Sequence, residues 1–278
     1  MTTLQAASQA AQLSDAEFAR LAAIAAKEAG LSIPSSKKSL VQSRISRRMR
    51  ELGLRDCGAY LARLDTDASE TRELISVLTT NVSNFYRERH HFEYLLAKVV
   101  PHLAEKLRRG GRVRIWSAGC SSGQEPYTIA IELLKAMPEA SSADILVLGS
   151  DIDPKILRRA VDGVYTHADL EPVAPPDRRA FFQAAGDGQM RVADRVRALV
   201  RFRELNLHAA WPMKGTFDAI FCRNVVIYFD DEVQRRLWPR FRDKLEPEGC
   251  LFLGHSERIH PLDDTGFRTA GVTIYQKT

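Results

Sequence analysis

The sequence predicts an α/β protein in which a helical region precedes a mostly parallel sheet with helices on both faces. From Arg112 to the C-terminus, strand-like and helix-like segments alternate, which is typical of βαβ units. Before residue 80, apolar residues recur only at helical spacing. The chain has 278 residues, of which 45% are hydrophobic, so it can bury the core of one large or two modest domains.

The first part of the chain divides into three segments. Residues 1–13 lack the basic and apolar regions of a signal peptide, and we expect a flexible leader there. Residues 14–80 are expected to form a helical domain, and residues 81–111 a connector with a linking helix that bends or breaks at Pro101. The predicted helices of the domain run from a capping box at Ser14–Glu17 to Gly30, from a cap at Ser35-Ser36 to about Leu52, and over residues 57–64 and 70–78.

Residues 112–278 are expected to form the α/β domain. Residues 164–206 interrupt the alternation and are rich in Pro, Asp and Arg, so we expect an inserted segment with a small antiparallel piece. The chain should end in a hairpin around Gly271. The predicted strands lie at 113–118, 145–149, 217–222 and 250–254, and further helices lie near 154–161 and 231–245.

The turn from Gly119 to Gly123 lies between the first predicted strand and a helix. Glycine lets a ligand approach the backbone, and the free N–H groups of a first helical turn attract negative charge. The arrangement is typical of a nucleotide site, although an ordinary βα turn would have the same pattern. Glu125 adds a carboxylate to the first helical turn, which argues against a pyrophosphate and for a ligand with a cation or an amine.

A nicotinamide-dependent oxidoreductase is the first alternative function. The turn has the spacing Gly-x-x-x-Gly and lacks the Gly-x-Gly-x-x-Gly pattern of dinucleotide sites. The first acidic strand end, Asp151, follows Gly119 by 32 positions, whereas the dinucleotide motif places its acid about 20 residues further on. Both differences disfavour this alternative.

Polar residues also follow the other predicted strands. In an open α/β sheet, ligands bind outside the carboxyl ends of the strands, so these residues are candidates for one site. Asp151 could accept hydrogen bonds from two ribose hydroxyls, whereas Asp153 is expected to cap the helix that follows it. The remaining strand-end candidates are Asn206 and Leu207 on one strand and Cys222, Arg223 and Asn224 on another.

Composition limits the cellular compartment, the metal sites and the partners that we expect for the protein. The four cysteines are scattered and have no histidine partner at metal spacing, so we expect neither a disulfide framework nor a metal site. No apolar run is long enough to cross a bilayer, and we expect a monomeric cytoplasmic protein without membrane insertion. The net charge of +5 suggests a methyltransferase of RNA or a binding module as a second alternative. The basic residues cluster on one helix without interleaved aromatics, so we expect no nucleic-acid partner.

Five segments of the chain together resemble the chemotaxis receptor methyltransferases, which esterify glutamates with S-adenosylmethionine. The resemblance covers nearly the whole chain, and its motifs occur in the same order as in that family. It implies a helical N-terminal domain, a class I methyltransferase domain and an inserted three-stranded antiparallel subdomain. The segments are TTNVSNFYRE, WSAGCSSGQEPY, GSDIDPKIL, FDAIFCRNVVIYFD and LFLGHSE.

The resemblance also implies roles for individual residues. Arg87 and Tyr228 fall where the family places residues near the transferred methyl group. A glutamate substrate is ionised at neutral pH, so the reaction needs no general base. His90, His91 and His255 are accordingly interpreted as surface or capping residues. The positions that fall on the cofactor pocket, beside the Gly119 turn, are Asn81, Ser83, Arg87, Glu125, Asp151, Asn206, Leu207, Cys222, Arg223 and Asn224.

Within that pocket, Glu125 suits the amine of the cofactor, and Asp151 suits its ribose. Arg87 suits a carboxylate, which could belong to the cofactor or to the substrate glutamate. The expected product of the cofactor is S-adenosylhomocysteine.

The second predicted helix is expected to dock the cytoplasmic helical domain of a receptor. Seven basic residues and one acid lie between Lys37 and Arg55. Lys37, Arg44 and Arg48 share one helical stripe, and such a stripe would attract an acidic receptor segment. Some members of the family also bind a receptor tail through the inserted subdomain. The turn at 184–189 looks short for that role, and we expect no tail binding.

Overall fold

The computed structural model describes residues 13–278, which form two compact units. The smaller unit contains the chain up to Thr80 together with Tyr228–Asp230, and the larger unit contains Asn81–Ile227 and Asp231–Thr278. The expected leader falls almost entirely on residues 1–12, which lie outside the described part of the chain. No helix in residues 13–278 is both long and apolar enough to span a bilayer.

The smaller unit is helical, and its core is built from the apolar stripes of its helices. The capping box of Ser14 and Glu17 and the left-handed cap at Gly30 are confirmed at the two ends of the first helix. The predicted cap of the second helix is wrong, because Ser35–Lys37 form a short 3-10 turn and no side chain caps the helix. The helices are α1 (Asp15–Ala29), α2 (Lys38–Glu51), α3 (Cys57–Thr66) and α4 (Ala68–Leu78).

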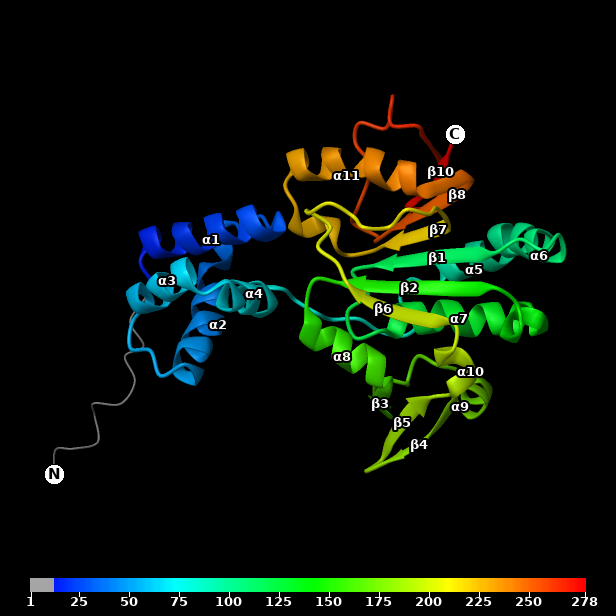
Figure 1. The fold of residues 1–278 in the computed structure, drawn as a ribbon, viewed down its shortest axis with the longest axis horizontal. Coiled ribbons are helices and arrows are strands. Elements are labelled where there is room, and N and C mark those ends of the chain that lie inside the picture. The colour runs from blue at the N-terminus through cyan, green and yellow to red at the C-terminus, as the bar shows by residue number, and fades with distance from the viewer. Residues whose placement is uncertain (1–12) are drawn as a thin grey trace. The chain divides into compact units, whose positions relative to one another are not determined.

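The larger unit contains a seven-stranded sheet in the order β6-β2-β1-β7-β8-β10-β9. The first five strands in this order are parallel, and the last two form the predicted C-terminal hairpin. Figure 1 shows the parallel strands side by side. The strands are β1 (Val113–Ala118), β2 (Ile145–Asp151), β6 (Val200–Glu204), β7 (Phe217–Cys222), β8 (Leu245–Leu253), β9 (Phe267–Gly271) and β10 (Ile274–Lys277).

Alternation along β1 places apolar side chains on both faces of the sheet, as a doubly covered parallel sheet requires. Val113 and Ile115 belong to the main core, together with residues of the helices that cover that face. Trp116 points to the other face and packs against Phe241 of the helix over it, with ring centroids 5.6 Å apart. The long helices of the unit are α6 (Val100–Arg108), α7 (Gln124–Ala136), α8 (Pro154–Asp162) and α11 (Asp231–Lys244).

The linking helix departs from regular α geometry where the sequence predicts a break. It consists of α5 (His90–Tyr94), a π-helical segment over Leu95–Val99, and α6, with Pro101 in the first turn of α6. Proline lacks the N–H that a continuous α-helix needs at this point, so the wider π turn accommodates it.

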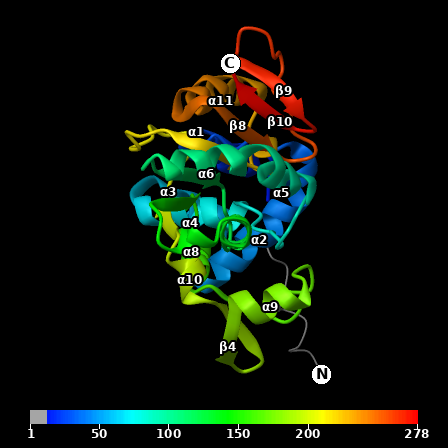
Figure 2. The same cartoon turned by 90° about the vertical axis from the view of Figure 1, so that its right-hand side faces the viewer.

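The inserted segment forms a three-stranded antiparallel sheet in the order β3-β5-β4. In Figure 2, β4 and α9 lie at one end of the larger unit and the β9-β10 hairpin lies at the other. The predicted end of the insertion at residue 206 is too late, because β6 already pairs with β2 in the main sheet. The elements of the insertion are β3 (Val164–Thr166), α9 (Pro175–Phe181), β4 (Phe182–Gly186), β5 (Gln189–Val192) and α10 (Asp194–Arg197).

Candidate functional site

Parallel pairing brings the ends of β1, β2, β6 and β7 to one edge of the sheet, which we call the strand-end edge. Backbone hydrogen bonds continue past the last paired residues. The Gly119 N–H donates to the Ser150 carbonyl at 2.7 Å, and the Leu205 N–H donates to the Asp151 carbonyl at 2.9 Å. The chain moves to opposite sides of β1 when it forms β2 and later β7, so the switch point of the sheet lies here. The sequence-predicted strand-end residues of the larger unit are therefore brought together.

The turn after β1 requires glycine for two reasons. Gly119 has a φ of +80°, and a Cβ atom there would lie 2.3 Å from Cγ2 of Val225. A larger residue would therefore push this turn away from the chain that follows β7. Within the turn, Ser121 is buried with a φ of +51°. Its Oγ has no hydrogen-bond partner within residues 13–278, which marks a polar group that a ligand could satisfy.

Asp151 lies at the end of β2, and its carboxylate faces the glycine turn. Its Oδ2 accepts a hydrogen bond from the Ser121 N–H at 2.8 Å, and its Oδ1 accepts one from the Asp153 N–H at 3.1 Å. Burial raises the pKa of Asp151 to about 6, although these N–H donors act in the opposite direction. Carboxylate lone pairs remain for hydroxyl donors of a ligand, since each oxygen can accept about two hydrogen bonds.

The start of the connector is attached to the helix that follows Asp151. Asn81 Nδ2 donates to Asp153 Oδ2 at 2.9 Å, and Asp153 Oδ1 accepts from the Lys155 N–H as the predicted cap of α8. Ser83 is half-buried two residues further along the connector. Asn81 thus lies beside the acidic strand end, as its assignment to the cofactor pocket requires.

The remaining strand-end candidates differ in burial. Asn206 is half-buried, and its Oδ1 accepts from the His208 N–H at 2.9 Å. Leu207 is buried, and its carbonyl accepts from the Trp211 indole N–H at 3.1 Å. Cys222 is fully buried within β7, and burial raises the pKa of its thiol well above the usual value. Asn224 follows with a left-handed φ of +59°.

Glu125 is paired with a buried cation of the chain itself. Its Oε2 lies 2.9 Å from Nη1 of Arg223, and its Oε1 accepts from the Ser117 hydroxyl at 2.7 Å. Arg223 is 6% exposed and also lies 3.3 Å from Oε2 of Glu88. No local pattern in the sequence indicated this network, in which one guanidinium lies close to two carboxylates. Glu125 therefore keeps only part of its hydrogen-bonding capacity for an amine.

Arg87 lies in a strained part of the connector. Tyr86 and Glu88 both have left-handed backbone with φ near +56°, a conformation that is costly for residues with a side chain. The Arg87 carbonyl accepts a hydrogen bond from Nη2 of Arg223. The Arg87 side chain is 33% exposed. Its Nη1 donates to the Val82 carbonyl at 3.2 Å, and its Nε lies 4.0 Å from Glu88 Oε1. The backbone of Arg87 is thus fixed, while much of its guanidinium remains accessible to an anion.

The histidines of this region require a correction. The interpretation of His91 as a surface or capping residue is wrong, because its side chain is fully buried, and burial lowers its pKa to about 3. It lies on the inner face of the linking helix, 3.0 Å from the Thr273 hydroxyl. His255 is exposed and lies 3.2 Å from Glu88. Glu88, His90 and His91 have potential metal-ligand atoms within 4.8 Å of one another, but the Arg223 cation lies beside Glu88 and opposes a metal ion there.

Glu257 is a buried residue of the site that the sequence reasoning did not single out. It is 3% exposed, and its carboxylate accepts four backbone N–H groups, from Asn224, Val225, Ile227 and Gly254. Burial raises the pKa of its carboxyl, whereas the four donors act in the opposite direction. Its position in the segment LFLGHSE was the available signal, since an acid three residues after a buried strand can reach the strand end.

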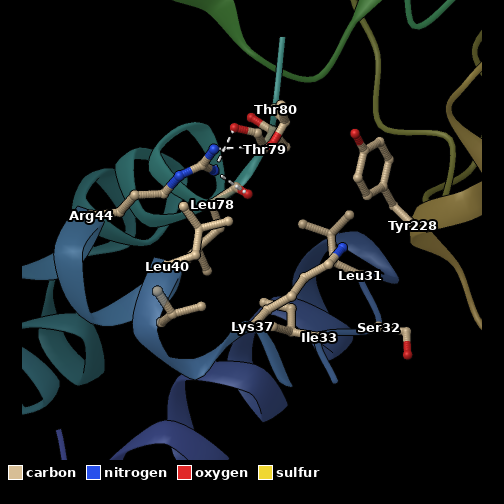
Figure 3. Close-up of a pocket in the computed structure, with 11 residues that line it drawn as sticks. Leu31, Ser32, Ile33, Lys37, Leu40, Arg44, Leu78, Thr79, Thr80 and Tyr228 are labelled. Carbon is tan, nitrogen blue, oxygen red and sulfur yellow. Dashed lines mark hydrogen bonds between the residues drawn. The ribbon is translucent and has the colours of Figure 1, made fainter. Parts of the chain in front are cut away.

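The smaller unit has its own pocket, which includes Tyr228 (Figure 3). The pocket has a volume of about 40 Å³, and most of its walls are apolar side chains such as Leu31 and Leu78. The Ser32 N–H donates to the Tyr228 carbonyl at 2.7 Å and thus holds this residue in the helical unit. The ammonium of Lys37, an exposed residue, lies 5.6 Å from the centroid of the Tyr228 ring.

Two of the three residues expected to dock a receptor have structural partners. Arg44 Nη1 donates to the carbonyls of residues 77–79 at the end of α4, as Figure 3 shows in part. Arg48 is 17% exposed and lies 2.6 Å from Glu70, which is 2% exposed. The helical stripe is therefore not a uniform docking surface, because α4 packs against part of it. Lys37, which lies in the 3-10 turn before α2, remains exposed, as do Arg47 and Arg50 on α2.

The strand-end edge fits S-adenosylmethionine, the cofactor that the sequence leads us to expect. Gly119 packs closely against Val225, which holds the turn beside the strand ends, and the buried Ser121 hydroxyl lacks a partner within residues 13–278. Asp151 offers acceptors for ribose hydroxyls, and Glu125 adds negative charge for an amine. The carboxylates of Glu88 and Glu125 are balanced by the guanidiniums of Arg223 and Arg87, the latter with its Nε 4.0 Å from Glu88 Oε1.

Comparisons with known proteins agree with S-adenosylmethionine as the cofactor. A family described as the CheR methyltransferase SAM-binding domain matches residues 81–276, and one described as the CheR methyltransferase all-alpha domain matches residues 16–79. A probable chemotaxis protein methyltransferase of Rhizobium etli is 46% identical over 90% of this chain and 96% of its own length. Chemotaxis protein methyltransferases of Klebsiella aerogenes and Escherichia coli are 42% and 40% identical, over 96% and 95% of this chain and 91% of each relative. The chain belongs to the CheR family of S-adenosylmethionine-dependent methyltransferases.

Proposed function

We propose that this methyltransferase modifies the glutamate side-chain carboxylates of chemotaxis receptors and forms glutamyl methyl esters. The family match makes the chain an S-adenosylmethionine-dependent methyltransferase, and its relatives are named chemotaxis protein methyltransferases. The observation that carries the choice of substrate is the position of Lys37 beside Tyr228, in a pocket of the helical unit. An ammonium group there favours an anionic substrate.

The bound cofactor supplies a methyl group on a positively charged sulfur. A carboxylate oxygen of the substrate forms the new C–O bond while the C–S bond breaks, and the electron pair of that bond stays on sulfur. The chain need not remove a proton, because a glutamate is ionised at neutral pH. Its residues must instead align the carboxylate and exclude water, since proximity and desolvation supply most of the acceleration.

Three groups of the chain would divide these tasks. The strand-end edge, with Asp151, Glu125 and Asn81, would hold the cofactor. Arg87 would bind a carboxylate through its accessible guanidinium, and its fixed backbone would keep that guanidinium in place. The Tyr228 ring would shape the space near the transferred methyl, in keeping with its position in the family motif.

The receptor would be attracted by the exposed basic residues of α2 and of the 3-10 turn that precedes it. Lys37, Arg47 and Arg50 are exposed, whereas Arg44 and Arg48 serve the helical unit itself. Long-range attraction of an acidic helical segment would raise the encounter rate and would depend on salt. We propose that the cytoplasmic helical domain of the receptor is the partner. The short turn at the tip of β4 and β5, Gly186–Gly188, supports the expectation that no receptor tail binds there.

Incubation with methyl-labelled S-adenosylmethionine and receptor-containing membranes tests this function. We expect label on the receptor that is released as methanol by mild base, because carboxyl methyl esters are base-labile. A matched receptor in which the modified glutamates are replaced by alanine should take up none. Base-stable label on protein or label on RNA would overturn the proposed substrate and leave the methyltransferase assignment intact.

A further inference from the structure

We infer that Glu257 is a positioning residue for the cofactor pocket, because it fixes the loop that follows β7. We call residues 224–227 the 224–227 loop. Glu257 Oε2 accepts the Asn224 N–H at 2.8 Å, and Glu257 Oε1 accepts those of Val225 at 2.8 Å and Ile227 at 3.2 Å. Oε2 also accepts the N–H of Gly254, the residue after β8, at 2.5 Å. One side chain thus joins the ends of two neighbouring strands.

The four N–H groups leave the carboxylate no free capacity. An ionised carboxyl offers about four lone-pair positions, and each of them has a donor here. Glu257 is therefore not available to bind substrate or to transfer a proton, although it lies at the edge where the cofactor binds. Its contribution to the site passes through the backbone that it holds.

The 224–227 loop contacts the cofactor turn directly. The Val225 side chain lies so close to Gly119 that a Cβ atom there would be 2.3 Å from Cγ2. Asn224 adopts its left-handed conformation next to Gly254, where an added Cβ would lie 2.5 Å from Asn224 Nδ2. A loop released from Glu257 would lose its fixed packing against the turn that cradles the cofactor.

The conservative variant Glu257→Gln isolates this role. An amide has about two acceptor positions and places an NH2 group against the other two N–H donors, so the loop loses its anchor. We expect calorimetry with S-adenosylhomocysteine to show at least a tenfold rise in Kd. Glu257→Asp keeps the charge and all four acceptor positions on a shorter side chain, and it should recover part of the affinity.

A general effect on folding is separated from positioning by two readouts. Loss of folded protein lowers the binding stoichiometry at constant Kd, whereas a displaced loop raises Kd at full stoichiometry. Hydrogen exchange of the ligand-free protein should show faster exchange of residues 223–227 in Glu257→Gln, with unchanged exchange in α2. Glu70→Gln is the matched control, because Glu70 is also buried but lies in the smaller unit. This variant should leave the Kd for S-adenosylhomocysteine within twofold of the wild type.

The test does not depend on the identity of the methylated substrate, because it measures cofactor binding alone. In activity assays with receptor, Glu257→Gln should raise the KM for S-adenosylmethionine and leave the KM for receptor unchanged. Wild-type Kd for S-adenosylhomocysteine in folded Glu257→Gln would overturn the inference. Faster exchange of the 224–227 loop without a change in Kd would overturn it as well.

Discussion

Arg223 and Glu125 form a buried ion pair at the strand-end edge, with Nη1 and Oε2 2.9 Å apart. The same guanidinium lies 3.3 Å from Glu88 and donates to the carbonyl of Arg87. Arg223, the first residue after β7, therefore connects the first turn of α7 to the strained connector. The carboxylate expected to bind the cofactor amine is already part of a charge network of the protein.

Removal of Arg223 should therefore destabilise the fold as well as the site. Arg223→Ala leaves two carboxylates close together and poorly hydrated, and we expect a loss of about 3–5 kcal/mol in the free energy of unfolding. Urea denaturation measures this value. Glu125→Gln should cost far less stability, because the amide oxygen can still accept from Arg223, while its affinity for S-adenosylhomocysteine falls. Equal stability of Arg223→Ala and the wild type would contradict the network.

Cofactor binding should depend on pH through Asp151. Its pKa of about 6 keeps a large fraction of the carboxyl protonated near pH 5, and the ionised form accepts ribose hydroxyls more strongly. The affinity for S-adenosylhomocysteine should therefore rise between pH 5 and pH 7.5. Calorimetry over this range measures it. Asp151→Asn should flatten the profile, and Asp151→Ala should abolish binding with the fold intact. A wild-type profile in Asp151→Asn would exclude Asp151 as the titrating group.

The raised pKa of Asp151 also affects the stability of the ligand-free protein. Cofactor affinity should rise with pH, whereas the contribution of Asp151 to stability should fall. Asp151 titrates near 3.9 in an unfolded chain, so between about pH 4 and pH 6 the folded state binds more protons. Its contribution to stability is present below pH 4 and is lost as the pH rises through 6. The difference in unfolding free energy between the wild type and Asp151→Asn should therefore change over this interval and stay constant above pH 7.

Arg87 should contribute to turnover much more than to stability. Its side chain is one-third exposed, and its Nη1 donates a single hydrogen bond to a backbone carbonyl, so Arg87→Ala should change the free energy of unfolding by only about 1 kcal/mol. Loss of its carboxylate contact should lower kcat/KM about 100-fold or more, because alignment of the reactants is lost. Steady-state kinetics with receptor membranes measures the effect. Wild-type turnover in Arg87→Ala would remove Arg87 from the active centre.

The ring of Tyr228 should matter more than its hydroxyl. The residue is half-buried in its pocket. Its carbonyl accepts a hydrogen bond from the Ser32 N–H, which fixes the backbone that carries the ring. Tyr228→Phe should keep most of the activity. Tyr228→Ala should lose about tenfold or more, which corresponds to ~1.4 kcal/mol of transition-state stabilisation. Equal losses in the two variants would assign the main role to the hydroxyl.

The basic residues of α2 and of the 3-10 turn before it should differ in their effects on stability and on receptor binding. Arg48→Ala leaves the buried Glu70 without its cation and should destabilise the helical unit by about 3–5 kcal/mol. The charge reversals Lys37→Glu, Arg47→Glu and Arg50→Glu alter exposed side chains and should each change stability by only about 0.5 kcal/mol. Combined, they should raise the KM for receptor and weaken its dependence on salt. Cofactor affinity serves as the internal control, and unchanged receptor kinetics would exclude this surface from docking.

Features of the fold that depend on local sequence patterns could be predicted without the structure. Helical and alternating periodicity defined the helical region and the parallel sheet, and the capping box at Ser14 and the cap at Asp153 formed as their spacing predicted. Gly119 and Asp151 could be placed at one edge because parallel strands end together. These inferences succeeded because each requires only neighbours in the chain or the direction of a strand.

The pairing of the charged groups, by contrast, depends on contacts between distant parts of the chain. Arg48 and Glu70 are 22 residues apart, and Arg223 lies 98 residues after Glu125, so no local pattern indicates that their charges are already satisfied. The burial of His91 depends on contacts with Thr273 at the far end of the chain. Glu257 obtains its four donors from backbone N–H groups, which every non-proline residue carries. Long-range side-chain geometry therefore determines which charges remain free for a ligand.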